Sequence, residues 1–423
     1  MAAQVMESLH ADLAIVGGGA AGLAAAIFAA ESAPAGHRIV VLDGAKMLGA
    51  KILVSGGARC NVTHHEVFPH DYNGSRNIVR NILAAFDAAA TVRWFASLGV
   101  ELKHEPTGKL FPIQDSSRAV LNALLHRCGE LNIALHTDRR VTQITPPADE
   151  SDAFTITHSR GTLRCDRLIV STGGRSLPRT GSDGGGWEML QQLGHTVTPS
   201  YAALVPLVLA AQMFHADLAG IAQDVELSVF IDNKRVDHRA GSLLWTHFGI
   251  SGPVVMDASR HWTLAHETGQ KPRVQCNFFP GEDFEAVERW LVTTITARPR
   301  ASVLTHVSQR LSERLATTLL RHAEVDASIA AGQLSRDGRR ALVHALTALV
   351  LPVVQHRGWN YAEVTAGGVP LAEVDFRTMQ SRKIPRVYLA GETLDCDGRI
   401  GGFNFQWAWA TGYLAGRAAV ATR

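Results

Sequence analysis

The chain has 423 residues, more than a single hydrophobic core usually holds, so two or three domains are expected. Its 41 Lys and Arg residues nearly balance its 39 Asp and Glu residues, which leaves a formal net charge of +2. This balance gives no reason to expect a nucleic acid or an anionic membrane as partner. It favours an enzyme that acts on small molecules.

The cysteines are few and widely spaced, and no two of them form a C-x-x-C pair. An odd number at wide spacing argues against a disulfide framework and a zinc site, and the histidines show no metal-ligand spacing either, so no metal is expected. The apolar run at 345–354 is about half of the ~20 residues that a membrane span needs. We therefore expect a soluble cytoplasmic protein.

The first apolar segment, residues 12–16, has the character of a buried parallel strand. It is followed by G-x-G-x-x-G at residues 17–22 and by an alanine-rich helix at 23–30. Such a turn binds a pyrophosphate, because its glycines allow close backbone approach and the helix start presents free N–H groups. A second strand at 38–42 ends in Asp43, which is placed to accept a hydrogen bond from a ribose hydroxyl.

This fingerprint alone does not distinguish FAD from NAD. The stretch 46–61 is rich in glycine and basic residues, and it is either a wrap around the far end of a long dinucleotide or an ordinary solvated loop. Strands are expected at 139–145, at 167–174 and at 386–390. Glycines at 401–402 then open a last helix at 405–419, whose N-terminus suits the part of a flavin that gains negative charge on reduction. This C-terminal return favours FAD.

The ordered motifs resemble one known family. They are GGGAAG, Asp43, KILVSGGARCN, TGG at 172–174, THFGISGP at 246–253, VTAGGV at 364–369 and GETLDCDGRIGGFNFQWAWATG from residue 391. Together they are similar to the bacterial BaiN/YhiN-like flavoproteins, which include aminoacetone oxidase. The resemblance spans nearly the whole chain. It departs from the family at Ala58, where glycine is usual, and at Asp43, where glutamate is frequent.

The resemblance implies an α/β fold with a Rossmann-like FAD-binding domain of the glutathione-reductase type. This domain would comprise residues 1–194 and 362–423, with an inserted β-rich domain at 195–280 and a small helical domain at 281–361. The expected FAD-binding residues are Gly17, Gly19, Ala21, Gly22, Asp43, Lys46, Lys51, Gly57, Ala58, Arg59, Cys60, Asn61, Val141, Thr172, Gly173, Gly391, Glu392, Gly402, Phe403 and Asn404.

In the inserted part, short strands are expected at 203–209, 225–231, 234–238 and 271–279, and helices at 286–296, 301–316 and 337–350. No second G-x-G-x-x-G occurs there, although flavin reductases with two dinucleotide-binding domains carry one for NAD(P)H. Electrons would therefore come from the substrate, from transiently docked NAD(P)H or from another protein.

Three residues are candidates for chemistry. His247 could handle a proton, because histidine titrates near neutral pH, or it could be a structural residue at a domain junction. Cys60 could be a reactive thiol with a pKa lowered by Arg59, or a small packed residue. Arg399 could bind a substrate carboxylate or a flavin carbonyl, or form a surface ion pair.

The sequence thus favours an FAD-dependent oxidoreductase acting on a small organic substrate, either as an oxidase or as a reductase of an enone-like bond. A flavoprotein that acts on RNA is disfavoured by the absence of a basic stripe. A redox-sensing flavin-binding protein without turnover is the remaining alternative. Substrate, electron partners and oligomeric state are left open.

Overall fold

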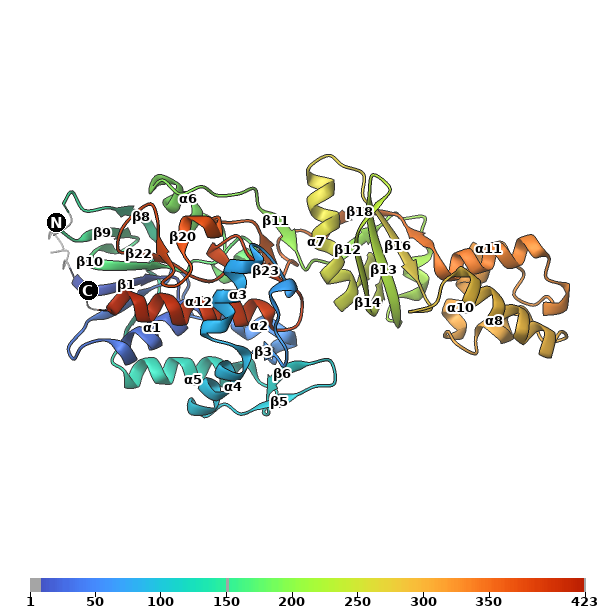
Figure 1. Ribbon diagram of the computed structural model, residues 1–423, viewed down its shortest axis with the longest axis horizontal. Coiled ribbons are helices and arrows are strands. Elements are labelled where there is room, and N and C mark those ends of the chain that lie inside the picture. The colour runs from blue at the N-terminus through green and yellow to red at the C-terminus, as the bar shows by residue number, and fades with distance from the viewer. Residues whose placement is uncertain (1–8, 150–151, 422–423) are drawn as a thin grey trace, which may run out of the picture. The chain divides into compact units, whose positions relative to one another are not determined.

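The computed structural model describes residues 9–149 and 152–421, and the chain forms two compact units (Figure 1). Of the described residues, those up to Ala202 and those from Ala362 make up unit 1, and Ala203–Tyr361 make up unit 2. Strand β11 (Tyr201–Ala203) lies where the chain passes from one unit to the other. The three-part domain division given above stays a prediction.

Unit 1 is built around a nine-stranded sheet in the order β20-β21-β22-β10-β1-β2-β7, with β9 pairing to β10 and β8 to β9. Its parallel strands are β1 (Leu9–Val16), β2 (Ile39–Leu42), β7 (Ala134–His136), β10 (Gly161–Val170) and β22 (Val387–Leu389). Its antiparallel strands are β8 (Val141–Thr145), β9 (Phe154–His158), β20 (Val374–Asp375) and β21 (Gln380–Ser381). The apolar runs expected to be strands form its centre, as burial on both faces requires.

Helices and short strands complete unit 1. The helices are α1 (Ala20–Ser32), α2 (Ala50–Ala58), α3 (Arg76–Ala85), α4 (Ala88–Ser97), α5 (Ser117–Glu130), α6 (Gly185–Gln192) and α12 (Phe403–Val420). The remaining short strands are β3 (Thr63–His64), β4 (Tyr72–Asn73), β5 (Leu102–His104), β6 (Lys109–Pro112), β19 (Val364–Ala366) and β23 (Asp397–Gly398).

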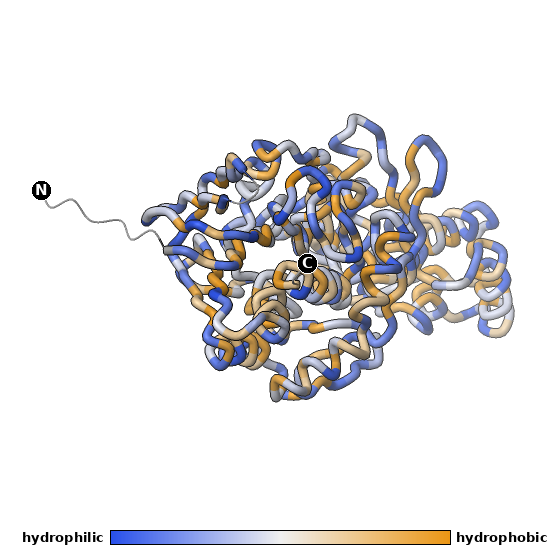
Figure 2. Tube along the Cα trace, turned by 60° about the vertical axis from the view of Figure 1, so that its left-hand side comes forward, coloured by the Kyte–Doolittle hydropathy of each residue, from blue (hydrophilic) through white to orange (hydrophobic). Residues whose placement is uncertain are grey.

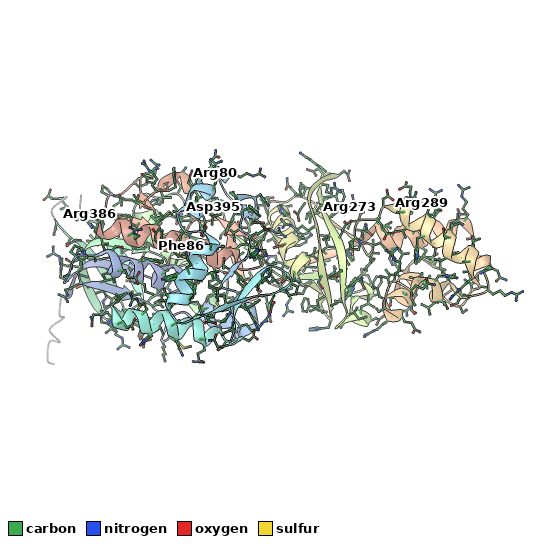
Figure 3. The ribbon with its side chains drawn as sticks, turned by 60° about the horizontal axis from the view of Figure 1, so that its bottom comes forward. Arg80, Phe86, Arg273, Arg289, Arg386 and Asp395 are labelled. Carbon is green, nitrogen blue, oxygen red and sulfur yellow. The ribbon has the colours of Figure 1, made fainter. Side chains whose placement is uncertain are left out.

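Helices α1 and α12 lie side by side and are apolar nearly all round, because other elements cover them (Figures 1 and 2). Beyond them an aromatic cluster fills the space toward α3 and α4. Phe28 packs edge-on against Phe86 with ring centroids 5.3 Å apart, and Phe86 stacks on Tyr413 at 4.9 Å. The position of Phe86 is marked in Figure 3. The cluster anchors the last helix against the first.

Unit 2 contains a seven-stranded antiparallel sheet in the order β17-β16-β13-β14-β15-β12-β18. Its strands are β12 (Leu207–Leu209), β13 (Ala222–Ile231), β14 (Lys234–Thr246), β15 (Gly249–Ser251), β16 (Arg273–Asn277), β17 (Leu349–Leu351) and β18 (Val353–His356). Its helices are α7 (Pro253–Glu267), α8 (Phe284–Ala297), α9 (Val303–Val307), α10 (Glu313–His322) and α11 (Arg336–Thr347).

Two helices expected in unit 2 differ from those observed. The segment 301–316 is not one helix, because the chain turns between Ser308 and Ser312, residue types that favour turns and caps. The expected helix at 337–350 ends at Thr347, since the following residues pair with β16 as β17. In that second case, sheet pairing overrides helical periodicity.

No helix within the described ranges 9–149 and 152–421 combines the length and the apolar character needed to cross a membrane.

Candidate flavin-binding site

The turn between β1 and α1 has the geometry of a phosphate cradle. Gly17 has φ +105°, and a Cβ there would lie 2.4 Å from the carbonyl oxygen of Ser171. A Cβ on Gly22 would lie 1.9 Å from the carbonyl oxygen of Gly17, whereas one on Gly19 would meet nothing within 4 Å. Gly17 and Gly22 are therefore required by the fold, and the space beside Gly19 is left for a ligand.

The N-termini of α1 and α12 point the same way. A Cβ on Gly412 would lie 2.7 Å from the carbonyl oxygen of Ala21, and one on Gly416 would lie 2.3 Å from that of Ala25. The helices therefore run parallel at very close approach, and α12 begins about 12 Å ahead of α1 along the common direction. An elongated anionic molecule can thus lie against the free N–H groups of both helix starts.

The end of β10 borders the same turn, since Ser171 donates hydrogen bonds from its hydroxyl to the carbonyl oxygens of Val16 and Gly17. Thr172 and Gly173 follow directly. The Thr172 hydroxyl and the Asn61 Oδ1 are buried and have no hydrogen-bond partner among the described residues. A bound polar molecule within reach would satisfy such orphaned groups.

At the other end of the cradle, Asp43 accepts two backbone hydrogen bonds of 2.7 Å, from the N–H groups of Gly18 and Ala45. Its carboxylate is therefore fixed beside the glycine turn. Carboxylates retain further acceptor sites after two such bonds. The shorter aspartate still occupies the position at which a ribose hydroxyl would donate.

Two further expected contacts lie near Asp43. The N–H of Arg139 donates to the carbonyl oxygen of Asp43 at 2.8 Å, which brings the start of β8 at Val141 beside the end of β2. Lys46 is exposed and forms no ion pair with any described residue. It remains available to a negatively charged group.

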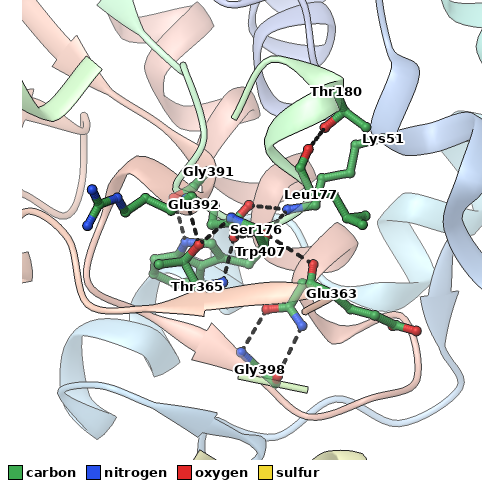
Figure 4. A network of polar contacts seen from close by, with 12 residues as sticks. Lys51, Ser176, Leu177, Thr180, Glu363, Thr365, Gly391, Glu392, Gly398 and Trp407 are labelled. Carbon is green, nitrogen blue, oxygen red and sulfur yellow. Dashed lines mark hydrogen bonds and ion pairs between the residues drawn. The ribbon is translucent and has the colours of Figure 1, made fainter. Parts of the chain in front are cut away.

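A partly buried polar network joins four separate segments around Glu392 (Figure 4). Lys51 Nζ lies 2.6 Å from one carboxylate oxygen of Glu392 and 2.5 Å from the Ser176 hydroxyl. The other oxygen of Glu392 accepts from Ser176 at 2.8 Å and from the N–H of Thr365 at 2.7 Å. The network ties α2, the segment after β10, β19 and the C-terminal motif into one wall.

Gly391 is wedged between the two parallel helices. Its φ is +70°, and a Cβ there would lie 2.7 Å from that of Ala21. Its N–H donates to the Thr411 hydroxyl at 2.9 Å, and its carbonyl oxygen accepts from Trp407 Nε1 at 3.2 Å. Gly391 and Glu392 are therefore held against the helix start that carries the phosphate cradle.

Gly401 and Gly402, which precede α12, pack against the N-terminal part of unit 1. A Cβ on Gly402 would lie 2.6 Å from the carbonyl group of Thr63. Phe403 is buried, and the amide of Asn404 closes the loop by accepting from the N–H of Gly398 at 2.8 Å and donating to its carbonyl oxygen at 3.0 Å. Asn404 shapes this loop through its hydrogen bonds.

The stretch 46–61 is only partly the flexible loop that its glycines suggested. Residues 50–58 form α2, which is interrupted by extended backbone at Ser55 and by left-handed backbone at Gly56 and Gly57. Ala58 (φ +65°) continues this left-handed path, and Cys60 (φ +61°) is left-handed again after the right-handed Arg59. An L-residue in this region costs about 1 kcal/mol relative to glycine, so Ala58 carries strain that a glycine would not.

Comparisons with known proteins decide the family. The HI0933-like protein Rossmann domain matches residues 11–418. The chain belongs to this family. It is a family of Rossmann-type flavoprotein oxidoreductases, in agreement with the BaiN/YhiN-like resemblance and with the α/β fold.

Three proteins are similar to this HI0933-like chain in sequence or in structure. A 3-dehydro-bile acid delta(4,6)-reductase of Clostridium scindens is 32% identical over 96% of this chain and 98% of its own. A ribosomal RNA dihydrouridine synthase of Escherichia coli is 31% identical over 97% of this chain and 98% of its own. A variant of Escherichia coli quinol fumarate reductase FrdA, 16% identical, superposes with a TM-score of 0.51 over 98% of this chain and 70% of its own. The last likeness concerns the fold alone.

The side chain of Arg59 in this HI0933-like protein forms ion pairs with two carboxylates and stacks on an aromatic ring. Its guanidinium lies 2.6 Å from Glu105 and 3.5 Å from Asp115, and it stacks on the ring of Phe111 at 4.0 Å. Glu105 is the main cause of a raised pKa at Arg59. These contacts turn the side chain toward β5 and β6.

Cys60 does not have the environment of a reactive thiol. It is fully buried, and burial raises the pKa of its thiol to about 12. The expectation that Arg59 lowers this pKa is therefore wrong, because desolvation of the thiolate outweighs a guanidinium that is already neutralised by carboxylates.

We expect the native protein at pH 7 to leave all five cysteines unmodified by a thiol-specific disulfide reagent, since all five are buried. After denaturation in urea, the same reagent should titrate five thiols. A rapid one-equivalent reaction of the folded protein, mapped to Cys60 by mass spectrometry, would contradict this account.

The two other candidates for chemistry lie in different settings. Arg399 Nη1 lies 3.3 Å from the buried carboxylate of Asp71, so it forms the ion pair that was the alternative to a substrate contact. His247 is exposed in unit 2, in the turn between β14 and β15, next to Phe248. A catalytic role for His247 stays a prediction.

Three residues of the cradle were missed in the sequence. Ser176 and Thr365 hold Glu392, and Thr411 holds Gly391. The only available signals were their positions inside or next to the TGG, VTAGGV and C-terminal motifs, and these motifs do not reveal which side chain bonds to which carboxylate.

Proposed function

We propose that the protein is an FAD-dependent reductase that saturates a carbon–carbon double bond conjugated to a carbonyl group. The observation that carries this proposal is the chemistry shared by the names of two relatives that span nearly the whole chain. A delta(4,6)-reductase of 3-dehydro-bile acids and a dihydrouridine synthase each describe the addition of two hydrogens to such a bond.

The cradle supports FAD as the cofactor. The N–H groups at the start of α1 would hold the pyrophosphate, and Asp43 would accept from the adenosine ribose. Glu392, fixed by Lys51, would accept from hydroxyl groups between the two ends of the cofactor. The N-terminus of α12 would stabilise the negative charge of a reduced flavin.

The reaction balances with a reduced nicotinamide as the electron donor. When bound, FAD would supply the hydride-transfer chemistry by which a hydride from NAD(P)H reaches the carbon β to the carbonyl group. A proton then adds to the α carbon, so that one NAD(P)H and one proton are consumed for each double bond saturated. His247 is the proposed source of that proton, as an exposed histidine in the turn between β14 and β15.

Product analysis tests this proposal. The purified protein with FAD and NADPH, incubated without oxygen with a 3-oxo-Δ4 bile acid, is expected to yield a product heavier by two hydrogens and an equal amount of NADP⁺. Consumption of oxygen without saturation of the double bond would instead indicate an oxidase and would refute the proposal.

A second candidate substrate is a uracil ring in ribosomal RNA, which the Escherichia coli relative favours by name. A structural observation agrees with it. Six exposed arginines of the segment 289–340 have guanidinium groups that make no ion pair or hydrogen bond with the described residues: Arg289, Arg298, Arg300, Arg314, Arg336 and Arg340. Unpaired arginines of this kind can bind phosphates. Ribosomal RNA from cells that lack the gene would then lose one dihydrouridine, and the purified protein would restore it.

A further inference from the structure

Unit 2 carries an exposed cluster of aromatic and cationic side chains that the cofactor cradle does not use. The guanidinium carbon of Arg357 lies 4.1 Å from the ring centroid of Phe248 and 3.9 Å from that of Tyr361. The ring of His247 packs edge-on against Phe248 at 5.1 Å. Half of the Tyr361 side chain is exposed, and His247 is exposed as well.

Strand β12 fixes the backbone of this cluster. The N–H of Leu209 donates to the carbonyl oxygen of Phe248 at 3.1 Å, and the N–H of Arg357 donates to that of Pro206 at 3.0 Å. A Cβ on Gly249 would lie 2.3 Å from the carbonyl oxygen of Leu207, so the turn that carries Phe248 is pressed onto the strand. The cluster is therefore held in place before any ligand arrives.

The polar groups of Arg357 and His247 remain available to a ligand. Among the described residues, the guanidinium of Arg357 and the imidazole of His247 have no hydrogen-bond or carboxylate partner. Two other arginines that stack on rings in unit 2 differ in this respect. Arg273 also bonds to Gln275 at 3.1 Å, and Arg310 bonds to Glu282 at 3.1 Å.

We propose that His247, Phe248, Arg357 and Tyr361 form the substrate-recognition site, and that its ligand is a planar unsaturated ring bearing a carbonyl oxygen. Two aromatic rings pack against the guanidinium of Arg357, and its N–H groups, which lie in the plane of the guanidinium, can donate to an oxygen acceptor. The exposed half of Tyr361 offers a surface on which a flat ring stacks. The choice of ring rests on the proposed reductase function.

Equilibrium dialysis of the oxidised, FAD-loaded protein tests this site without turnover. The probes are 3-oxo-4-cholenoic acid and a uridine pentanucleotide. We expect the unsubstituted protein to bind at least one of them, and the one that binds identifies the source of the ring. Arg357→Met is expected to weaken that binding about tenfold or more, and Tyr361→Leu several-fold. Arg273→Met, at a ring-stacked arginine of β16 in the same unit (Figure 3), should change it less than about twofold.

Arg357→Lys guards against a folding artefact, because it keeps the charge but loses the planar fork and should bind with intermediate affinity. Equal binding by the parent, Arg357→Met and Tyr361→Leu proteins would overturn the proposal, as would failure of both probes to bind the parent. If binding depends on Arg357 but neither probe is ever reduced, the site stands and the reductase function fails. The two conclusions are therefore separable.

Discussion

The Gly19→Ala variant is expected to fold as stably as the parent protein but to lose its FAD. A Cβ on Gly19 meets no protein atom within 4 Å, and its backbone angle is allowed for alanine, so the fold has no reason to resist the change. The added methyl group would instead occupy the space through which a pyrophosphate approaches the start of α1. We expect FAD affinity to fall about tenfold or more, or by at least about 1.4 kcal/mol.

A matched control is Gly129→Ala, whose Cβ also meets nothing within 4 Å, but which lies inside α5. It should retain FAD fully and gain about 0.5–1 kcal/mol in stability, because alanine is the better helix former. The two variants are compared by the flavin absorbance that remains after gel filtration and by urea unfolding. Full retention of FAD by Gly19→Ala would mean that the glycine turn is not the phosphate site.

The Lys51→Met variant is expected to destabilise the FAD-free protein by about 2 kcal/mol. The side chain of Glu392 is only 16% exposed, and the substitution removes its cationic partner. An unpaired charge that is largely shielded from water lowers the free energy of unfolding. A second substitution, Glu392→Gln, should recover part of the loss, since it removes the stranded charge. Urea unfolding of the parent, both single variants and the double variant measures the coupling.

Lys103→Met is the control for this prediction. Lys103 also pairs with a carboxylate, Asp115, but their side chains are 38% and 44% exposed. Solvent screening should limit its effect to about 0.5 kcal/mol. Equal effects of the two lysine substitutions would show that the Glu392 network does not stabilise the cradle.

The glycine turns of the cradle could be predicted from the sequence, because a Cβ at Gly17 or Gly22 would collide with backbone atoms whatever the surrounding side chains. The Rossmann fold and the meeting of both chain ends were also predictable, because glycine motifs that open a helix occur near both ends of the sequence. The family match confirms the fold. That each cradle residue contacts FAD stays a prediction.

Other features depend on contacts between distant segments and leave no local signal. Glu392 is held by Lys51, 341 residues away in the sequence, and by Ser176, 216 residues away. The sequence showed Arg59 beside Cys60 but not the carboxylates of Glu105 and Asp115, which draw the guanidinium away. Residues 349 and 350 fell at the end of the helix expected at 337–350, and only the pairing of β17 with β16 made them part of a strand. In each case tertiary contacts decide the outcome.

The most direct test of the account is a single turnover. The FAD-loaded protein is reduced with NADPH without oxygen, freed of excess nucleotide, and mixed with a 3-oxo-Δ4 bile acid or a uridine-containing RNA. The account predicts that the flavin absorbance returns as the double bond of one of these compounds is saturated, with one product formed per flavin. A flavin that stays reduced with both compounds and is reoxidised only by air would contradict it.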